Sequence, residues 1–198
     1  RRSRTKSFYA ERTRLPFERV ARVSKGGLRR LFSRSLELLH HRRGMPYAHV
    51  WYYPDAAPSV CTFRVDTDYA EERHVRAASE IGRKSGLPIT WFVDVKSQEG
   101  MLGIYAEMGG DEVGVHCYEH DTFSDYGRNL ENIRKALRAM DKAGRRPRGF
   151  ASPFGMWNEG LARAVEECGF EYSSEFAYDY DNLPSAPWLG ERFSGTLQ

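Results

Sequence analysis

FRVDTDY, residues 63–69, places Asp66 and Asp68 at the end of a strand predicted over residues 59–65. Residues two apart on a strand point to the same side of its sheet. Two carboxylates held this close raise one another's pKa unless a cation lies beside them. The pattern therefore favours a metal-binding or proton-transfer role, although Asp is also common in turns and at helix N-termini.

Strands and helices alternate along the chain from residue 59 onward. Strands are predicted over residues 59–65, 88–93, 112–116, 148–152 and 170–176, and helices over 71–85, 97–108, 125–143 and 158–168. This alternation is typical of parallel βα units and leaves open whether the sheet is a barrel or an open sheet. In both architectures, reactive side chains lie in the loops that follow the carboxyl ends of the strands.

A second polar cluster, HCYEH, follows the third predicted strand and contains His116 and His120. Imidazoles four residues apart can bind one cation when the backbone turns between them, and neutral imidazole is a preferred zinc ligand. Two His and one Asp would leave a coordination position open, as catalytic sites require. The thiol of Cys117 is an alternative ligand. The three cysteines of the chain are too few and too widely spaced for a disulfide framework.

The N-terminal part differs in charge from the rest, so we divide the chain into a basic helical arm (1–50) and a domain (51–198). Residues 1–57 hold 14 Lys+Arg and 4 Asp+Glu, although the whole chain has a formal net charge of only +3. Apolar residues recur at helical spacing within GGLRRLFSRSLELLHH, residues 26–41. This amphipathic helix could pack on the domain or lie on an anionic membrane surface. Nucleic-acid binding is not expected, because no stacking aromatics accompany the basic residues.

These motifs, in this order, resemble the polysaccharide deacetylases with NodB homology, which form carbohydrate esterase family four. Members carry an aspartate pair after the first strand, HxxxH after the third, and an Arg-x-Pro-aromatic-Gly loop after the fourth. The third motif is matched here by FASPFG, residues 150–155, and the resemblance covers about residues 51–180. It implies a distorted (β/α) barrel, which we expect to be incomplete at its C-terminal end.

The resemblance also implies roles for individual residues. Asp66 matches the catalytic base, and Asp68, His116 and His120 match the ligands of a divalent metal, for which Zn is expected. The residues matching the substrate groove are Tyr118, Pro153, Phe154 and Gly155. The implied reaction is removal of an N-acyl group, typically acetyl, from amidosugars of a bacterial glycan.

Two features depart from the family pattern. Ala151 stands where members carry the Arg that orients the base, and Arg64 or Arg148 could supply this charge instead. No His follows His120, so the family's general acid has no direct counterpart. Asp179 and Asp181 fall about where a further Asp motif is expected.

Alternative functions therefore remain open. The chain could deacylate or deformylate lipid-linked sugars, for which the basic arm would supply membrane contact, or it could be a non-catalytic carbohydrate-binding relative. A cytoplasmic or membrane-peripheral location is expected, because no signal peptide is visible in the sequence.

Overall fold

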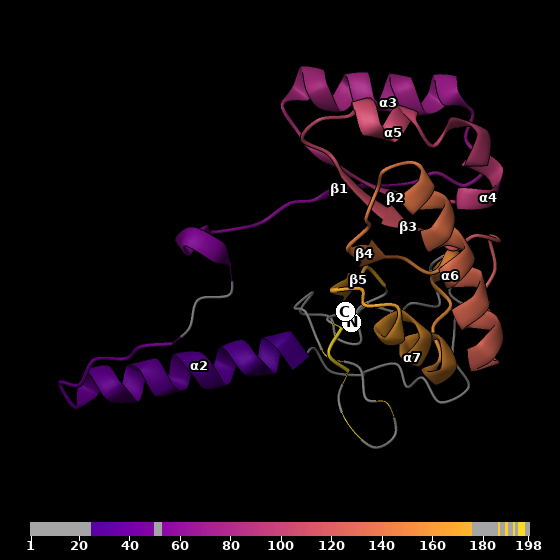
Figure 1. Cartoon of the computed structure of the whole chain (residues 1–198). Helices are drawn as coiled ribbons and strands as arrows, with labels where there is room; N and C mark the ends of the chain where they lie inside the picture. Colours follow the sequence, from indigo (N-terminus) through magenta and orange to yellow (C-terminus); the bar gives the residue numbers. More distant parts are fainter. Residues whose placement is uncertain are drawn as a thin grey trace.

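A five-stranded parallel sheet forms the centre of the molecule (Figure 1). The computed structural model describes residues 25–49, 53–175, 186, 189, 192 and 194–196. The strands pair in the order of the sequence and are β1 (Phe63–Asp66), β2 (Ile89–Val93), β3 (Glu112–Val115), β4 (Gly149–Phe150) and β5 (Tyr172–Ser173). The five predicted strands are confirmed, but each is shorter than predicted, and β1 begins only at Phe63.

Helices follow the strands and lie in an arc beside the sheet (Figure 1). The helices α3 (Glu72–Ser85), α6 (Tyr126–Lys142) and α7 (Glu159–Glu167) match the predicted bounds to within one residue. The continuous helix predicted over 97–108 is wrong. This region forms α4 (Val95–Gln98), the 3-10 turn η3 (Glu99–Met101) and α5 (Ile104–Glu107). Two glycines in this segment, residues 100 and 103, explain the interruption because glycine disfavours a helix interior.

The main core lies between the sheet and the helices. Alternate side chains of β2, among them Trp91 and Val93, point toward the helical layer and are fully buried. They belong to one apolar cluster with Ile133 and Met140 of α6, and α6 packs in turn against α7. The burial of these large side chains fixes the strands and hence the loops at their carboxyl ends.

The opposite face of the sheet is curled around a smaller interior. Phe92 points to this face, where its ring lies 4.9 Å from the guanidinium carbon of Arg64 and 6.4 Å from the ring centroid of Tyr172. Arg64 belongs to β1 and Tyr172 to β5, which are the two edge strands of the sheet. The edges therefore approach each other across Phe92, as in the distorted barrel expected from the sequence.

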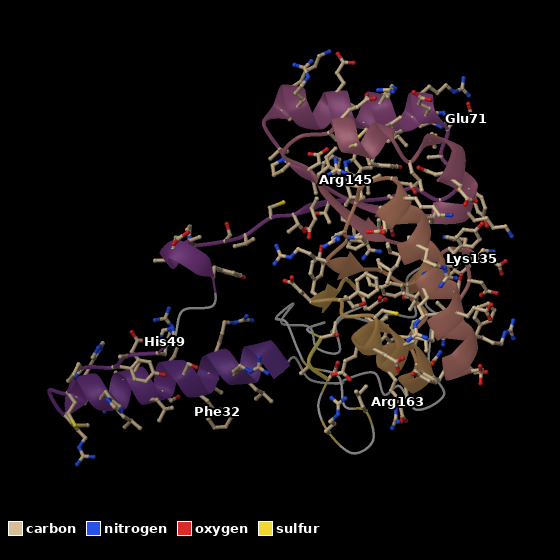
Figure 2. All side chains as sticks on the ribbon, in the orientation of Figure 1. Phe32, His49, Glu71, Lys135, Arg145 and Arg163 are labelled. Carbon is tan, nitrogen blue, oxygen red and sulfur yellow. The ribbon has the colours of Figure 1, made fainter. Side chains whose placement is uncertain are left out.

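Helix α2 (Lys25–Arg42) lies apart from the sheet and its helices (Figure 1). Phe32, which projects outward from α2 in Figure 2, is 67% exposed, and the other apolar residues of the helix are also exposed, namely Leu28, Leu31, Leu36, Leu38 and Leu39. Within the described residues, no helix is both long enough and apolar enough to span a membrane. The short 3-10 turn η2 (Pro54–Ala56) lies between α2 and β1.

Candidate active site

Three polar side chains converge at the carboxyl ends of β1 and β3. The ligand atoms of Asp68, His116 and His120 all lie within 4.8 Å of one another. Oδ1 of Asp68 is 3.3 Å from Nε2 of His116 and 3.1 Å from Nε2 of His120. The side chains of both His are almost fully buried, whereas that of Asp68 is 49% exposed. The two His of the cluster are therefore enclosed by the protein, and its Asp68 side is open to solvent.

The orientation of His116 is set by the backbone of the next strand. Nδ1 of His116 donates a hydrogen bond of 2.8 Å to the carbonyl oxygen of Ala151, which can only accept. Nδ1 therefore carries a proton, and Nε2, the other ring nitrogen, faces Asp68. A metal-binding His usually donates a hydrogen bond in this way from the ring nitrogen that does not face the metal.

Aromatic rings hold His120 in place. Its ring centroid lies 5.3 Å from that of Tyr69 and 4.9 Å from that of Phe154, both in edge-on geometry. Interaction with Asp68 raises the pKa of His120, and contact with His116 and His120 holds the pKa of Asp68 well below its usual range. Each group thus favours the charged form of its neighbour.

The loops that carry the cluster contain strained backbone. Tyr69 after β1, Cys117 after β3 and Phe154 after β4 have positive φ angles of 56°, 65° and 58° although none is glycine. Such angles cost free energy and persist where the surrounding structure enforces them, often at functional sites. Here each strained residue is directly beside, or in ring contact with, a residue of the Asp–His–His cluster.

Asp66 lies on the same side of β1 as Asp68 but has a different partner. The guanidinium of Arg64 binds it in a bidentate manner, with Nε–Oδ1 and Nη2–Oδ2 distances of 2.7 Å. Arg148 instead pairs with Glu171. Of the two arginines considered as replacements for the one missing at position 151, Arg64 is therefore the one that contacts Asp66.

Arg64, Asp66, Asp68 and His116 line one pocket of about 350 Å³, whereas His120 is not among its lining residues. Besides Asp66, Asp68 and His116, the pocket walls include Phe154 and Gly155 of the third motif. A larger hollow lies at the opposite, amino ends of β2 and β3, with Pro88 and Asp111 among its residues. Asp66, Asp68 and His116 line the first of these two hollows, and none of them lines the second.

Two residues assigned to the groove do not line this pocket. Pro153 is buried beneath the loop, and Tyr118 is 7% exposed, donates a hydrogen bond to Glu99 and lies under the ammonium of Lys135. The left-handed conformation of Cys117 turns the chain, so the Tyr118 side chain packs toward α6 rather than the pocket. Asp179 and Asp181 lie outside the described residues.

Sequence reasoning missed two acidic residues near the site. Glu175, two residues beyond β5, lines the pocket, and burial raises its pKa to about 7. Asp94, at the end of β2, is 1% exposed, and its carboxylate has no hydrogen-bond partner among the described residues. Asp94 follows β2 directly and Glu175 lies two residues beyond β5, which is the same positional signal that drew attention to Asp66 and Asp68.

The sequence of the central region matches a known family. The family model of polysaccharide deacetylase matches residues 55–173, more than half of the chain. The chain belongs to the polysaccharide deacetylase family. The matched segment contains all the strands and the whole Asp–His–His cluster. No curated protein matches the sequence of this polysaccharide deacetylase family member.

Solved structures share the fold of this polysaccharide deacetylase family member at low sequence identity. A Mycobacterium smegmatis protein named as a polysaccharide deacetylase has a TM-score of 0.61 and 18% identity, with 77% of this chain and 62% of that chain covered. Streptococcus pyogenes deacetylase PplD, in complex with acetate, has a TM-score of 0.51 and 16% identity over 60% and 57% of the two chains.

One structural neighbour is described as a pseudoenzyme. A mutant of BA3943, a family four pseudoenzyme from Bacillus anthracis, has a TM-score of 0.51 and 18% identity over 66% of this chain and 52% of that one. The present chain thus spans less than two thirds of each of these three structures. Because the fold is shared by a pseudoenzyme, activity has to be inferred from the site residues themselves.

Proposed function

We propose that the chain is a metal-dependent hydrolase that removes N-acyl groups, typically acetyl, from amidosugars of a polysaccharide or glycan. The observation that carries this proposal is the Asp68–His116–His120 cluster, of which Asp68 and His116 line the same pocket as Asp66. A binding protein for sugars would not need two buried imidazoles aimed at one carboxylate oxygen beside a second, separately held carboxylate.

The donor set fits a divalent cation. Nε2 of His116 faces an oxygen of Asp68 at 3.3 Å, while Nδ1 of the same ring donates to the backbone. A ring nitrogen and a carboxylate oxygen at this separation repel each other unless a proton or a cation lies between them. Nδ1 of His120 is also buried without a hydrogen-bond partner among the described residues. Two imidazoles and one carboxylate are a ligand set that suits Zn²⁺.

Different residues at the pocket would have different roles in the reaction. Asp68, His116 and His120 would hold the cation, which supplies Lewis acidity for water activation and for polarising an amide carbonyl. Asp66 would take a proton from the attacking water, and its bidentate partner Arg64 would hold the carboxylate in position. Phe154 and Gly155 would bound the sugar on one side of the pocket.

The test of this function is a metal analysis combined with an assay of acetate release from N-acetylglucosamine oligomers. The purified protein is expected to hold one equivalent of zinc, to release acetate, to lose activity with a chelator and to regain it with Zn²⁺. The same oligomer after chemical de-N-acetylation serves as the substrate control. A metal-free protein that binds the oligomer without hydrolysing it would instead be a carbohydrate-binding relative.

A second candidate is a deacylase of lipid-linked sugars, and the surface of α2 favours it. The apolar residues of α2 form one exposed stripe, and Arg29 and Arg34 flank it at opposite edges. Glu37, the one acidic residue of α2, is already paired with Arg34 at 2.8 Å. An exposed apolar stripe between arginines fits the surface of an anionic bilayer, where it would place the pocket near a membrane-bound substrate.

Vesicle binding tests this membrane role. The protein is expected to sediment with phosphatidylserine vesicles, and the double variant Leu31→Glu/Phe32→Glu is expected to bind at least about tenfold more weakly because its apolar contact is lost. The matched control is His41→Glu, which adds a negative charge on the polar side of α2. Equal binding by the wild type and the double variant would contradict a lipid contact through this stripe.

A further inference from the structure

Hydrogen bonds from two neighbouring serines hold Glu175 in the pocket. Its Oε1 accepts from the backbone N–H of Ser152 at 2.8 Å and from Oγ of Ser173 at 2.7 Å. Its Oε2 accepts from Oγ of Ser152. Ser152 directly follows Ala151, whose carbonyl orients His116. The carboxyl of Glu175 is thus fixed to the same loop that orients a residue of the metal cluster.

Glu175 is also linked to the opposite edge of the sheet. Arg64, which binds Asp66, also donates from Nη1 to the backbone oxygen of Ser174 and, at 2.9 Å, to Oγ of Ser174. The residue pair 174–175 is therefore held beside Arg64, and Asp66 and Glu175 line one pocket from opposite edge strands. The carboxyl group of Asp66, bound by the guanidinium of Arg64, and that of Glu175, bound by serine hydroxyls, therefore face the same pocket.

The two carboxyl groups lie in different environments. Asp66 is paired with the guanidinium of Arg64 at 2.7 Å. Burial raises the pKa of Glu175 to about 7, and its hydrogen bonds with Ser152 and Ser173 offset only part of this effect. The other charged or titratable groups around Glu175 are Arg64, Asp66, Asp68, His116 and Cys117. A pair of carboxyl groups separated in this way can serve as base and acid of one reaction.

We propose that Glu175 is the general acid that protonates the leaving amine, an inference that rests on the hydrolase function proposed above. Glu175 lies in the same pocket as Asp66, and it is held there by serine hydroxyls and a backbone N–H rather than by a cationic side chain. Oε2 is the oxygen that carries the proton, since Oε1 already accepts two hydrogen bonds and the hydroxyl of Ser152 can reverse its role.

The protons of the reaction are then accounted for. Water adds to the amide carbon and gives one proton to Asp66. As the C–N bond breaks, its electron pair remains on nitrogen, which receives the proton of Glu175. The immediate products are a carboxylic acid and an amine, which become a carboxylate and an ammonium group when the acid gives its proton to the amine. Proton exchange with solvent returns Asp66 and Glu175 to their starting states.

The test compares two substrates that differ in their need for an acid. An N-acetylglucosamine oligomer has a poor amine leaving group, whereas 4-nitrophenyl acetate releases a phenolate that leaves without a proton. Glu175→Gln is expected to lower kcat on the oligomer by about 10²-fold or more and to leave kcat on the ester nearly unchanged. Glu171→Gln is the matched control, because this exposed residue pairs with Arg148 outside the pocket.

The outcomes separate this inference from the function on which it rests. If the wild type hydrolyses neither substrate although it holds zinc, the hydrolase function and the role of Glu175 both fail. If the wild type hydrolyses the oligomer and Glu175→Gln slows both substrates equally, the function stands and the acid role is overturned. If Glu175→Gln loses kcat on the oligomer but not on the ester, with unchanged zinc content, the result supports Glu175 as the general acid.

The pH dependence of folding stability gives a second readout. The folded-state pKa of Glu175 is about 7, above the ordinary value of 4.5, so folding favours the protonated form. Its contribution to stability is complete below about pH 4.5 and is lost as the pH rises through about 7. The urea midpoint of the wild type, relative to Glu175→Gln, is therefore expected to fall between about pH 5 and about pH 8. A constant difference would mean that Glu175 is ionised throughout, which overturns the acid role.

Discussion

His120→Ala is expected to abolish zinc binding and amide hydrolysis while the protein stays folded. The imidazole of His120 lies 3.1 Å from Asp68 and is held between the rings of Tyr69 and Phe154. Loss of a direct ligand should weaken metal affinity by more than the 10- to 100-fold that is typical when only an outer partner of a metal site is lost. Zinc content after dialysis and acetate release from N-acetylglucosamine oligomers measure the two effects.

The matched control for this variant is His41→Ala. His41 lies in the last turn of α2 and is exposed, so its replacement should change neither zinc content nor turnover. His116→Ala should behave like His120→Ala, because both imidazoles face one oxygen of Asp68. Full zinc occupancy in either cluster variant would contradict the assignment of these residues as ligands.

The position of the cluster could be predicted because it depends on chain order alone. Asp68 and His116 follow strands β1 and β3, and the carboxyl ends of parallel strands meet at one edge of a sheet. Alternation along a strand likewise accounts for the contact between Arg64 and Asp66, which lie two residues apart. Local periodicity was sufficient for these features.

Features that depend on the curvature of the sheet could not be predicted in the same way. Glu175 reaches the pocket because β5 curls toward β1, whereas Arg148 directly precedes β4 and pairs with Glu171, which directly precedes β5, at the opposite, amino end of the sheet. The direction of Tyr118 follows from the positive φ of Cys117, an unusual conformation for any residue other than glycine. The spacing of apolar residues in the sequence predicts neither the position of Glu175 nor the direction of Tyr118.

The broken helix between β2 and β3 has a related cause. Gln98 donates hydrogen bonds to the carbonyl oxygens of Thr67 and Ala70, which lie on either side of Asp68 and Tyr69 in the chain. The buried hydroxyl of Tyr105 donates to Gln98 in turn. The irregular segment therefore supports the loop that carries Asp68, and this tertiary role is invisible in the helical spacing of its apolar residues.

Asp66→Asn is expected to retain zinc but to lose most of its activity. The carboxylate of Asp66 is bound by Arg64 and is absent from the Asp–His–His cluster, so the metal ligands should be untouched. Asn can still accept a hydrogen bond from Arg64 but cannot take a proton from water. Loss of a general base typically lowers the rate by about 10²-fold or more, and this should appear in kcat on the oligomer and on the ester alike.

Asp68→Asn provides the matched comparison, because the same substitution is made two residues further along the same loop. It replaces the carboxylate that lies 3.3 Å and 3.1 Å from the two imidazoles, so zinc affinity should fall along with activity. Zinc content and kcat of the two variants, measured side by side, therefore distinguish a base from a ligand. If Asp66→Asn also lost its zinc, Asp66 would itself be a ligand, and the base would have to be sought among the other residues that line the pocket.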